Sequence, residues 1–221
     1  MATTARICDD RLMGLPRRDG ARHTYADYRR WPDDVRCELI AGEVYAMAPA
    51  PSIRHQEMVL ALVRQIADAL EGGPCRPFVA PVDVRLPLAG EANDDVDTVV
   101  QPDILVVCDR GKVDSAGVRG APDWIIEVLS PSTAGHDQVR KRDLYERHGV
   151  REYWTVHPID NVVTVMRLDN GRYREVEFQE LVGRTVCTAI PAVAIDWDRA
   201  LQSVRAAGDP ALESDARDSL A

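Results

Sequence analysis

The sequence predicts an α/β fold with a mixed central sheet flanked by helices. Two apolar runs, residues 99–107 and 124–129, are too continuous for strands with one face in water and are typical of central strands covered on both faces. Two longer segments, residues 53–70 and 137–148, are followed by glycines that commonly end helices. With 221 residues, of which 45% are hydrophobic, the chain is long enough to bury a core in one domain.

The helices have recognisable ends. Ser52 is expected to cap the first long helix, whose apolar residues recur at helical spacing. The second long helix follows residues 130–133, a strand-breaking stretch that contains a proline, and it ends at Gly149. A shorter helix is expected over residues 25–31, ended by Pro32.

Further strands are predicted where short apolar runs are bounded by turn signals. These are residues 37–40, 43–47, 76–80, 82–86, 151–156, 162–168 and 173–178. The first two flank Ala41-Gly42 and predict an N-terminal hairpin, and the last two flank Asp169-Asn170-Gly171, a strong hairpin signal. Residues 186–198 are expected to pack back as a short strand and a turn or helix, which completes a C-terminal β-extension.

The two ends of the chain differ in composition from its middle. Residues 1–22 mix acids with arginines and lack the apolar centre of a secretory signal, and residues 202–221 are acidic. We therefore expect a flexible N-terminal segment over 1–22, a single domain over 23–201 and a flexible acidic tail over 202–221. No apolar run approaches the roughly 18 residues of a membrane-spanning helix, so no membrane partner is expected.

The cysteines suggest a reducing compartment. They are odd in number, widely spaced and never arranged as C-x-x-C, at Cys8, Cys37, Cys75, Cys108 and Cys187. This pattern favours reduced thiols over a disulfide framework or a zinc site, and a cytoplasmic location.

Three charged residues stand in the most apolar part of the chain. Asp103 lies in QPDILVVC, Glu127 in PDWIIEVLSPST and Lys141 in DQVRKRDLYERHG. A carboxylate that loses its water in a strand is costly unless a partner neutralises it. A divalent cation such as Mg²⁺ is one such partner, because it is commonly held by one or two carboxylates and keeps positions open for phosphate and water. An added ammonium completes a set suited to phosphodiester hydrolysis.

Lys141 is unusual because lysine is rare in this chain. Of the 27 basic residues, only Lys112 and Lys141 are lysine. A compact ammonium can approach a water molecule or lose its proton, whereas a guanidinium stays planar and charged. The alternative is that Lys141 is one more basic residue on a solvated helix face, between Arg140 and Arg142. The two nearby carboxylates favour the functional interpretation.

Taken in order, these motifs resemble the Uma-two family of restriction-endonuclease-like proteins, within the PD-(D/E)XK nuclease superfamily. The similarity runs from about Tyr25 to Trp197. Its strongest segments are Gln101-Pro102-Asp103, Glu127-Val128-Leu129-Ser130-Pro131-Ser132-Thr133 and Gly149-Val150-Arg151-Glu152-Tyr153-Trp154. The resemblance implies a restriction-endonuclease-like core and an Mg²⁺-dependent endonuclease, with Mn²⁺ able to substitute. It also implies nucleic acid, DNA in particular, as substrate, and we expect a homodimer.

The chain departs from the superfamily pattern at one position. The usual lysine lies two residues after the second carboxylate, and that position is Leu129 here. The resemblance implies that the lysine has moved to the following helix as Lys141. Asp103 and Glu127 would then ligate the metal, and Glu38 would be a third, helper acid.

Three residues near these motifs have more than one interpretation. Glu38 is either that helper acid or part of a surface salt bridge. His55 either faces the cleft or, more commonly for a histidine in a first helical turn, is a polar cap or a solvated residue. Gln101 either hydrogen-bonds water, lysine or substrate, or satisfies backbone groups at a sheet edge.

The net charge gives a second hypothesis for function. A formal charge of −9 argues against a passive, high-affinity nucleic-acid binder, because a basic face normally dominates such affinity. It does not exclude an enzyme. The alternative is a catalytically silent dimeric binding module that keeps the carboxylates for structure.

Overall fold

A computed structural model describes residues 21–32, 35–47, 51–130 and 134–205, with only the backbone described for 134–139 and 205. The helices are α1 (Tyr25–Tyr28), α2 (Ile53–Ala69), α3 (Ala134–His148) and α4 (Trp197–Arg205), with short 3₁₀ turns at η3 (Asn93–Asp95) and η4 (Arg110–Lys112). The strands are β1 (Cys37–Ile40), β2 (Glu43–Ala46), β3 (Arg76–Val79), β4 (Val84–Arg85), β5 (Val99–Val100), β6 (Ile104–Val107), β7 (Val113–Asp114), β8 (Gly117–Arg119), β9 (Trp124–Val128), β10 (Glu152–His157), β11 (Val162–Asp169), β12 (Arg172–Glu180), β13 (Arg184–Val186) and β14 (Ala194–Asp196).

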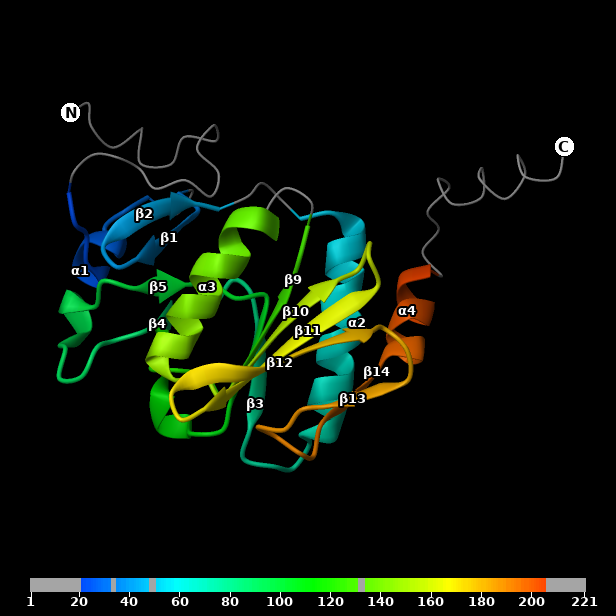
Figure 1. The fold of residues 1–221 in the computed structure, drawn as a ribbon. Helices are drawn as coiled ribbons and strands as arrows, with labels where there is room; N and C mark the ends of the chain where they lie inside the picture. Colours follow the sequence, from blue (N-terminus) through cyan, green and yellow to red (C-terminus); the bar gives the residue numbers. More distant parts are fainter. Residues whose placement is uncertain (1–20, 33–34, 48–50, 131–133, 206–221) are drawn as a thin grey trace, which may run out of the picture.

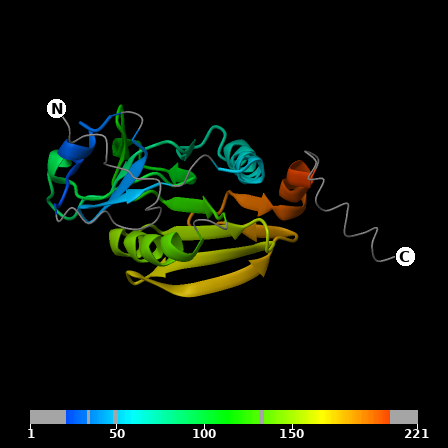
Figure 2. The same ribbon diagram turned by 90° about the horizontal axis from the view of Figure 1, so that it is seen from above.

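The strands form two mixed six-stranded sheets (Figure 1). The first has the order β2-β1-β5-β4-β8-β7 and the second the order β12-β11-β10-β9-β6-β3, while β13 pairs with β14. The predicted mixed α/β fold, N-terminal hairpin and C-terminal β-extension are confirmed. The predicted central sheet flanked by helices is the second sheet, and the hairpin forms one edge of the first sheet. Figure 2 shows the hairpin and α4 at opposite ends of the molecule.

Helices α2 and α3 cover opposite faces of the second sheet. Trp124 and Ile126 pack with Leu62 of α2, whereas Ile125 packs with Leu144 of α3. This alternation follows from the period of two along β9. Strand β9 is therefore buried on both faces, as its continuous apolar sequence predicts. No helix in the described ranges has the length and apolar character needed to cross a membrane.

The apolar run 99–107 is two strands, and its prediction as one strand was wrong. Strand β5 belongs to the first sheet and β6 to the second, so residues 101–103 cross between the sheets. Pro102 has no amide hydrogen for a ladder, and the amide of Gln101 donates to the Glu38 carboxylate at 2.9 Å instead of to a strand. This crossing leaves Asp103 at the entrance to β6.

The ends of the predicted domain are only partly described. Of the segment predicted to be flexible over 1–22, residues 1–20 lie outside the described ranges. At the other end, α4 runs to Arg205, so regular structure continues past residue 201 into the predicted acidic tail. Residues 206–221 of that tail lie outside the described ranges.

A buried carboxylate attaches the C-terminal extension to the second sheet. Glu152 in β10 has no exposed surface, and its two oxygens accept hydrogen bonds from the Trp154 indole (2.7 Å) and from the backbone amide of Ala189 (2.7 Å). A buried carboxylate is tolerated because such bonds replace its water.

The expectation of reduced thiols was wrong for Cys37, Cys75 and Cys108, which are all disulfide-bonded. Cys75 and Cys108 form a disulfide, because they extend the antiparallel pairing of Arg76 with Val107 by one residue on each side. Their separation of 33 residues gives no hint of this contact. Cys187 is buried as a free thiol. The expected cytoplasmic location loses the support that the cysteine pattern gave it.

Gly117 is a sensitive point in the first sheet. It has φ +116°, and an added Cβ would collide with the carbonyl oxygen of Asp83, which accepts a hydrogen bond from Val118. We expect Gly117→Ala to lower the free energy of unfolding by about 3 kcal/mol. Alanine would be strained at this positive φ, and its Cβ would also collide with the Asp83 carbonyl oxygen. Gly171→Ala is the control, because its φ is also positive (+77°) but no atom lies within 4 Å, and we expect a cost of about 1 kcal/mol. Equal losses in urea denaturation would contradict this account.

Candidate active site

The register of two central strands brings Asp103 and Glu127 together. Strands β6 and β9 are antiparallel with Ile104 opposite Ile126, so the next pair outward is Asp103 opposite Glu127. The backbone amide of Asp103 donates to Glu127 Oε2 at 3.3 Å, and the amide of Val128 donates to Asp103 Oδ2 at 2.8 Å. Both carboxylates are therefore held at the same end of the strand pair by backbone donors.

Helix α3 folds back over this strand end and adds two donors. Lys141 Nζ lies 3.1 Å from Glu127 Oε1, and the Tyr145 hydroxyl donates to the same oxygen at 2.9 Å. The two residues are one helical turn apart and share a face of the helix. The sequence interpretation missed Tyr145, although its spacing from Lys141 was a usable signal.

Lys141 is buried, so the solvated-face alternative is wrong. Its exposed fraction is 7%, and its ammonium also lies 3.1 Å from Glu38 Oε1. Glu38 comes from β1 of the first sheet and is 6% exposed, which excludes the alternative of a surface salt bridge. The same Glu38 oxygen accepts the Gln101 amide. Glu38 thus contacts Lys141, and through it the second sheet.

His55 lies against the other carboxylate. Ser52 caps α2 as predicted, accepting from the His55 backbone amide at 3.2 Å, while the His55 ring Nε2 lies 3.1 Å from Asp103 Oδ2. The residue is 8% exposed, so the more common interpretation of a solvated histidine was wrong. His55 packs on the α2 side of the strands and Lys141 on the α3 side.

The Gln101 side chain points to a neighbouring network. Its amide nitrogen donates to Asp83 Oδ1 at 2.8 Å and to the Tyr28 hydroxyl at 3.3 Å. The Tyr28 hydroxyl also donates to Asp83. Gln101 therefore contacts the proposed site through its backbone amide, by way of Glu38, and its side chain ties α1 to the loop before β4.

Burial and neighbouring charges shift the protonation of this cluster. Burial raises the pKa of Glu127 to about 7; the Lys141 ammonium opposes this, while the charges of Asp103 and Glu38 add to it. Burial lowers the pKa of His55, but its hydrogen bond to Asp103 and the charges of Asp103 and Glu127 outweigh that effect and leave the pKa raised. Lys141 thus contacts two of the three carboxylates, Glu38 and Glu127, and the third, Asp103, contacts His55, so the one lysine does not balance the carboxylates of the cluster.

This shortage of positive charge fits a divalent cation. Asp103 and Glu127 offer the carboxylate oxygens that Mg²⁺ prefers, and the Asp103 side chain, 22% exposed, is the more open of the two. Within the described part of the chain, no three His, Cys, Asp or Glu side chains form a metal-binding group. An ion held by these two acids would therefore complete its coordination with water and substrate oxygens, as Mg²⁺ commonly does.

Two known proteins are similar to this chain, one in sequence and one in fold. An uncharacterised protein of Synechocystis sp., slr1290, is 29% identical over 121 residues, which span 54% of this chain and 60% of that protein. The crystal structure of a nuclease described as "putative", belonging to DUF820 from Anabaena variabilis, superposes with a TM-score of 0.64 at 19% identity. That superposition covers 82% of this chain and 98% of the Anabaena chain, and it establishes a shared fold.

The family match covers the region that contains every residue of the candidate site. The model of the Uma2 family, described as "Putative restriction endonuclease", matches residues 25–198. This range agrees with the similarity expected from about Tyr25 to Trp197. Because it spans most of the chain, the protein belongs to the Uma2 family.

Proposed function

We propose that this protein is an Mg²⁺-dependent endonuclease that hydrolyses phosphodiester bonds in DNA. The observation that carries the proposal is the position of Lys141, whose ammonium lies 3.1 Å from both Glu38 and Glu127 beside the paired Asp103. A buried lysine next to two opposed carboxylates is an arrangement suited to binding and polarising a phosphate. The description of the family and the fold shared with the Anabaena nuclease support this assignment.

Asp103 and Glu127 would hold Mg²⁺, and Mn²⁺ is expected to substitute. When bound, the ion supplies Lewis acidity toward a phosphoryl oxygen and lowers the pKa of a coordinated water. Lys141 and Tyr145 both donate to Glu127 Oε1, which leaves Oε2 on the side of Asp103. His55 restrains Asp103 in the same way from the opposite face of the sheet.

Lys141 has the electrostatic role in this proposal. Its ammonium orients the attacking water and offsets charge that develops on the phosphoryl oxygens. Glu38 holds the ammonium in place from the first sheet, so it is a positioning residue and not a metal ligand. A homodimer acting on DNA remains part of the proposal, and a chain without cleavage activity would favour the silent binding module.

Lys141→Ala is the most informative substitution for this proposal. We expect cleavage to fall at least a hundredfold, the scale for losing one positioned electrostatic group. Because the ammonium is buried between two carboxylates, we also expect the metal-free protein to lose about 3 kcal/mol of stability, and Mn²⁺ to restore part of it. Activity and unfolding should be measured together. Lys141→Arg should rescue cleavage only partly.

Lys112→Ala is the matched control for the lysine. Lys112 is the other lysine of the chain, and its ammonium donates to the backbone carbonyl of Ala121 at 2.8 Å, outside the proposed site. We expect its cleavage rate to equal that of the wild type. Equal cleavage by wild type and Lys141→Ala, with both proteins folded, would show that Lys141 has no catalytic role.

The raised pKa of Glu127 predicts a pH dependence of stability. Because this pKa is about 7 in the folded protein against an ordinary 4.5, ionisation of Glu127 opposes folding. The metal-free protein should therefore be most stable, as far as this group is concerned, below pH 4.5 and should lose that contribution as the pH rises to about 7. Glu127→Gln should flatten the change in melting temperature across this range.

The same pKa predicts proton release when a divalent ion binds. A bound cation favours the ionised carboxylate, so binding of Mn²⁺ at pH 6 should release more protons than binding at pH 8. Calorimetry in buffers with different ionisation enthalpies measures this difference. Equal proton release at the two values, or its persistence in Glu127→Gln, would remove Glu127 from the metal site.

A further inference from the structure

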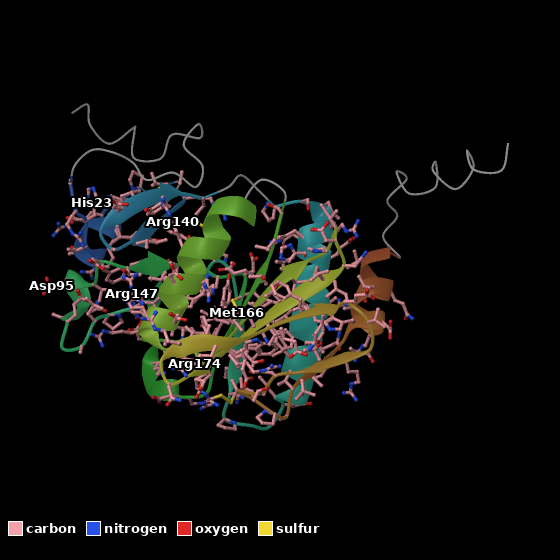
Figure 3. All side chains as sticks on the ribbon, viewed as in Figure 1. His23, Asp95, Arg140, Arg147, Met166 and Arg174 are labelled. Atoms are coloured by element: carbon pink, nitrogen blue, oxygen red, sulfur yellow. A yellow bond between two sulfur atoms is a disulfide. The ribbon has the colours of Figure 1, made fainter. Side chains whose placement is uncertain are left out.

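Arg140 lies beside the proposed site but contacts none of the proposed metal ligands. It immediately precedes Lys141 in α3, and its guanidinium carbon lies 4.8 Å from the centre of the Tyr45 ring in β2. Figure 3 shows Arg140 between α3 and the hairpin formed by β1 and β2. The Tyr45 hydroxyl donates to Glu43 at 2.8 Å, so the ring is anchored in its place. Stacking on an anchored ring restricts the guanidinium to few orientations.

The hairpin register relates Arg140 to the catalytic lysine. Tyr45 is directly opposite Glu38 in the β1–β2 pairing, so both side chains lie on the same face of the hairpin. Lys141 contacts Glu38 while Arg140 contacts Tyr45. Consecutive residues of α3 therefore lie over paired residues of the hairpin, which places the guanidinium next to the Lys141–Glu38 ion pair.

The guanidinium has an unused buried donor. Arg140 Nη1 is shielded from solvent and has no hydrogen-bond partner, and no carboxylate of the described residues forms an ion pair with Arg140. Arg85, a buried arginine stacked on Tyr25, instead has Asn93 and Asp114 as partners, each at 2.7 Å. A buried donor without a partner is costly, and a ligand can supply the missing acceptor.

We propose that Arg140 binds a phosphate of the nucleic-acid strand next to the scissile phosphate. A guanidinium can donate to phosphate oxygens in a fixed, planar geometry, and the stacking on Tyr45 holds this one in place while its Nη1 has no hydrogen-bond partner in the protein. This assignment rests on the proposed nuclease function. It adds a strand-binding contact to a chain whose overall charge is negative.

Arg140→Ala tests the proposal through binding rather than through cleavage. Affinity of the full-length protein for a labelled DNA duplex should be measured by fluorescence anisotropy over a range of salt, with Ca²⁺ in place of Mg²⁺ to suppress hydrolysis. We expect affinity to fall about tenfold and the slope of log affinity against log salt to decrease by about 1, as for the loss of one phosphate contact. In Mg²⁺, KM should rise while kcat changes little.

Two variants control for structure and for charge. Arg142→Ala removes a neighbouring arginine whose side chain is 43% exposed and lies 3.9 Å from Asp143, and we expect binding and salt slope like those of the wild type. Arg140→Lys keeps the positive charge but loses the planar pair of guanidinium donors. Compared with Arg140→Ala, it should therefore recover most of the salt slope and only part of the affinity. Arg140→Lys also preserves the test if Arg140→Ala does not fold.

The outcomes separate this inference from the proposed function. If the wild type cleaves DNA and neither Arg140 variant changes affinity or slope, the phosphate contact is wrong and the nuclease stands. If the wild type neither binds nor cleaves DNA, both fail. If inorganic phosphate raises the melting temperature through Arg140 while DNA affinity is unchanged in the variants, the site takes free anions and the nucleic-acid contact is overturned.

Discussion

The buried ammonium of Lys141 joins the three parts of the structure that build the candidate site. It contacts Glu38 in the first sheet and Glu127 in the second, and it comes from the helix that covers the second sheet. One positive charge thus links the two sheets to the helix that carries it. Removing one partner of such a buried pair leaves the other charge buried without compensation, which destabilises the fold. The positions of Lys141, Glu38 and Glu127 therefore depend on one another.

The same interaction explains the chemistry that the site can support. Lys141 offsets only part of the negative charge of Glu38, Asp103 and Glu127, and burial of Glu127 raises its pKa to about 7 in spite of the lysine. A cluster with unmatched carboxylates is electrostatically prepared for a cation. Replacing a buried ion pair by apolar residues of similar volume is often neutral or stabilising, so the buried charges are weak evidence for a purely structural role.

The charged residues of the candidate site could be predicted from the sequence, whereas the contacts between distant segments could not. Asp103, Glu127 and Lys141 were identifiable because charges are conspicuous in apolar strands and because lysine is rare here. The break at Pro102, the burial of His55 and the Cys75–Cys108 disulfide depend on contacts between segments far apart in the chain, which periodicity does not report. For the same reason, the sequence alone leaves Glu38 equally suited to a surface salt bridge, and its burial in β1 distinguishes the two.

A crystal structure of the wild-type protein soaked in Mn²⁺, with anomalous diffraction to locate the ion, tests the central claim most directly. The account predicts an anomalous peak from one Mn²⁺ ion that is ligated by Asp103 and by Glu127 Oε2. Lys141 should still contact Glu38, and the Tyr145 hydroxyl should still donate to Glu127 Oε1. No peak at these carboxylates under saturating Mn²⁺ would contradict it, as would an ion bound only by other residues.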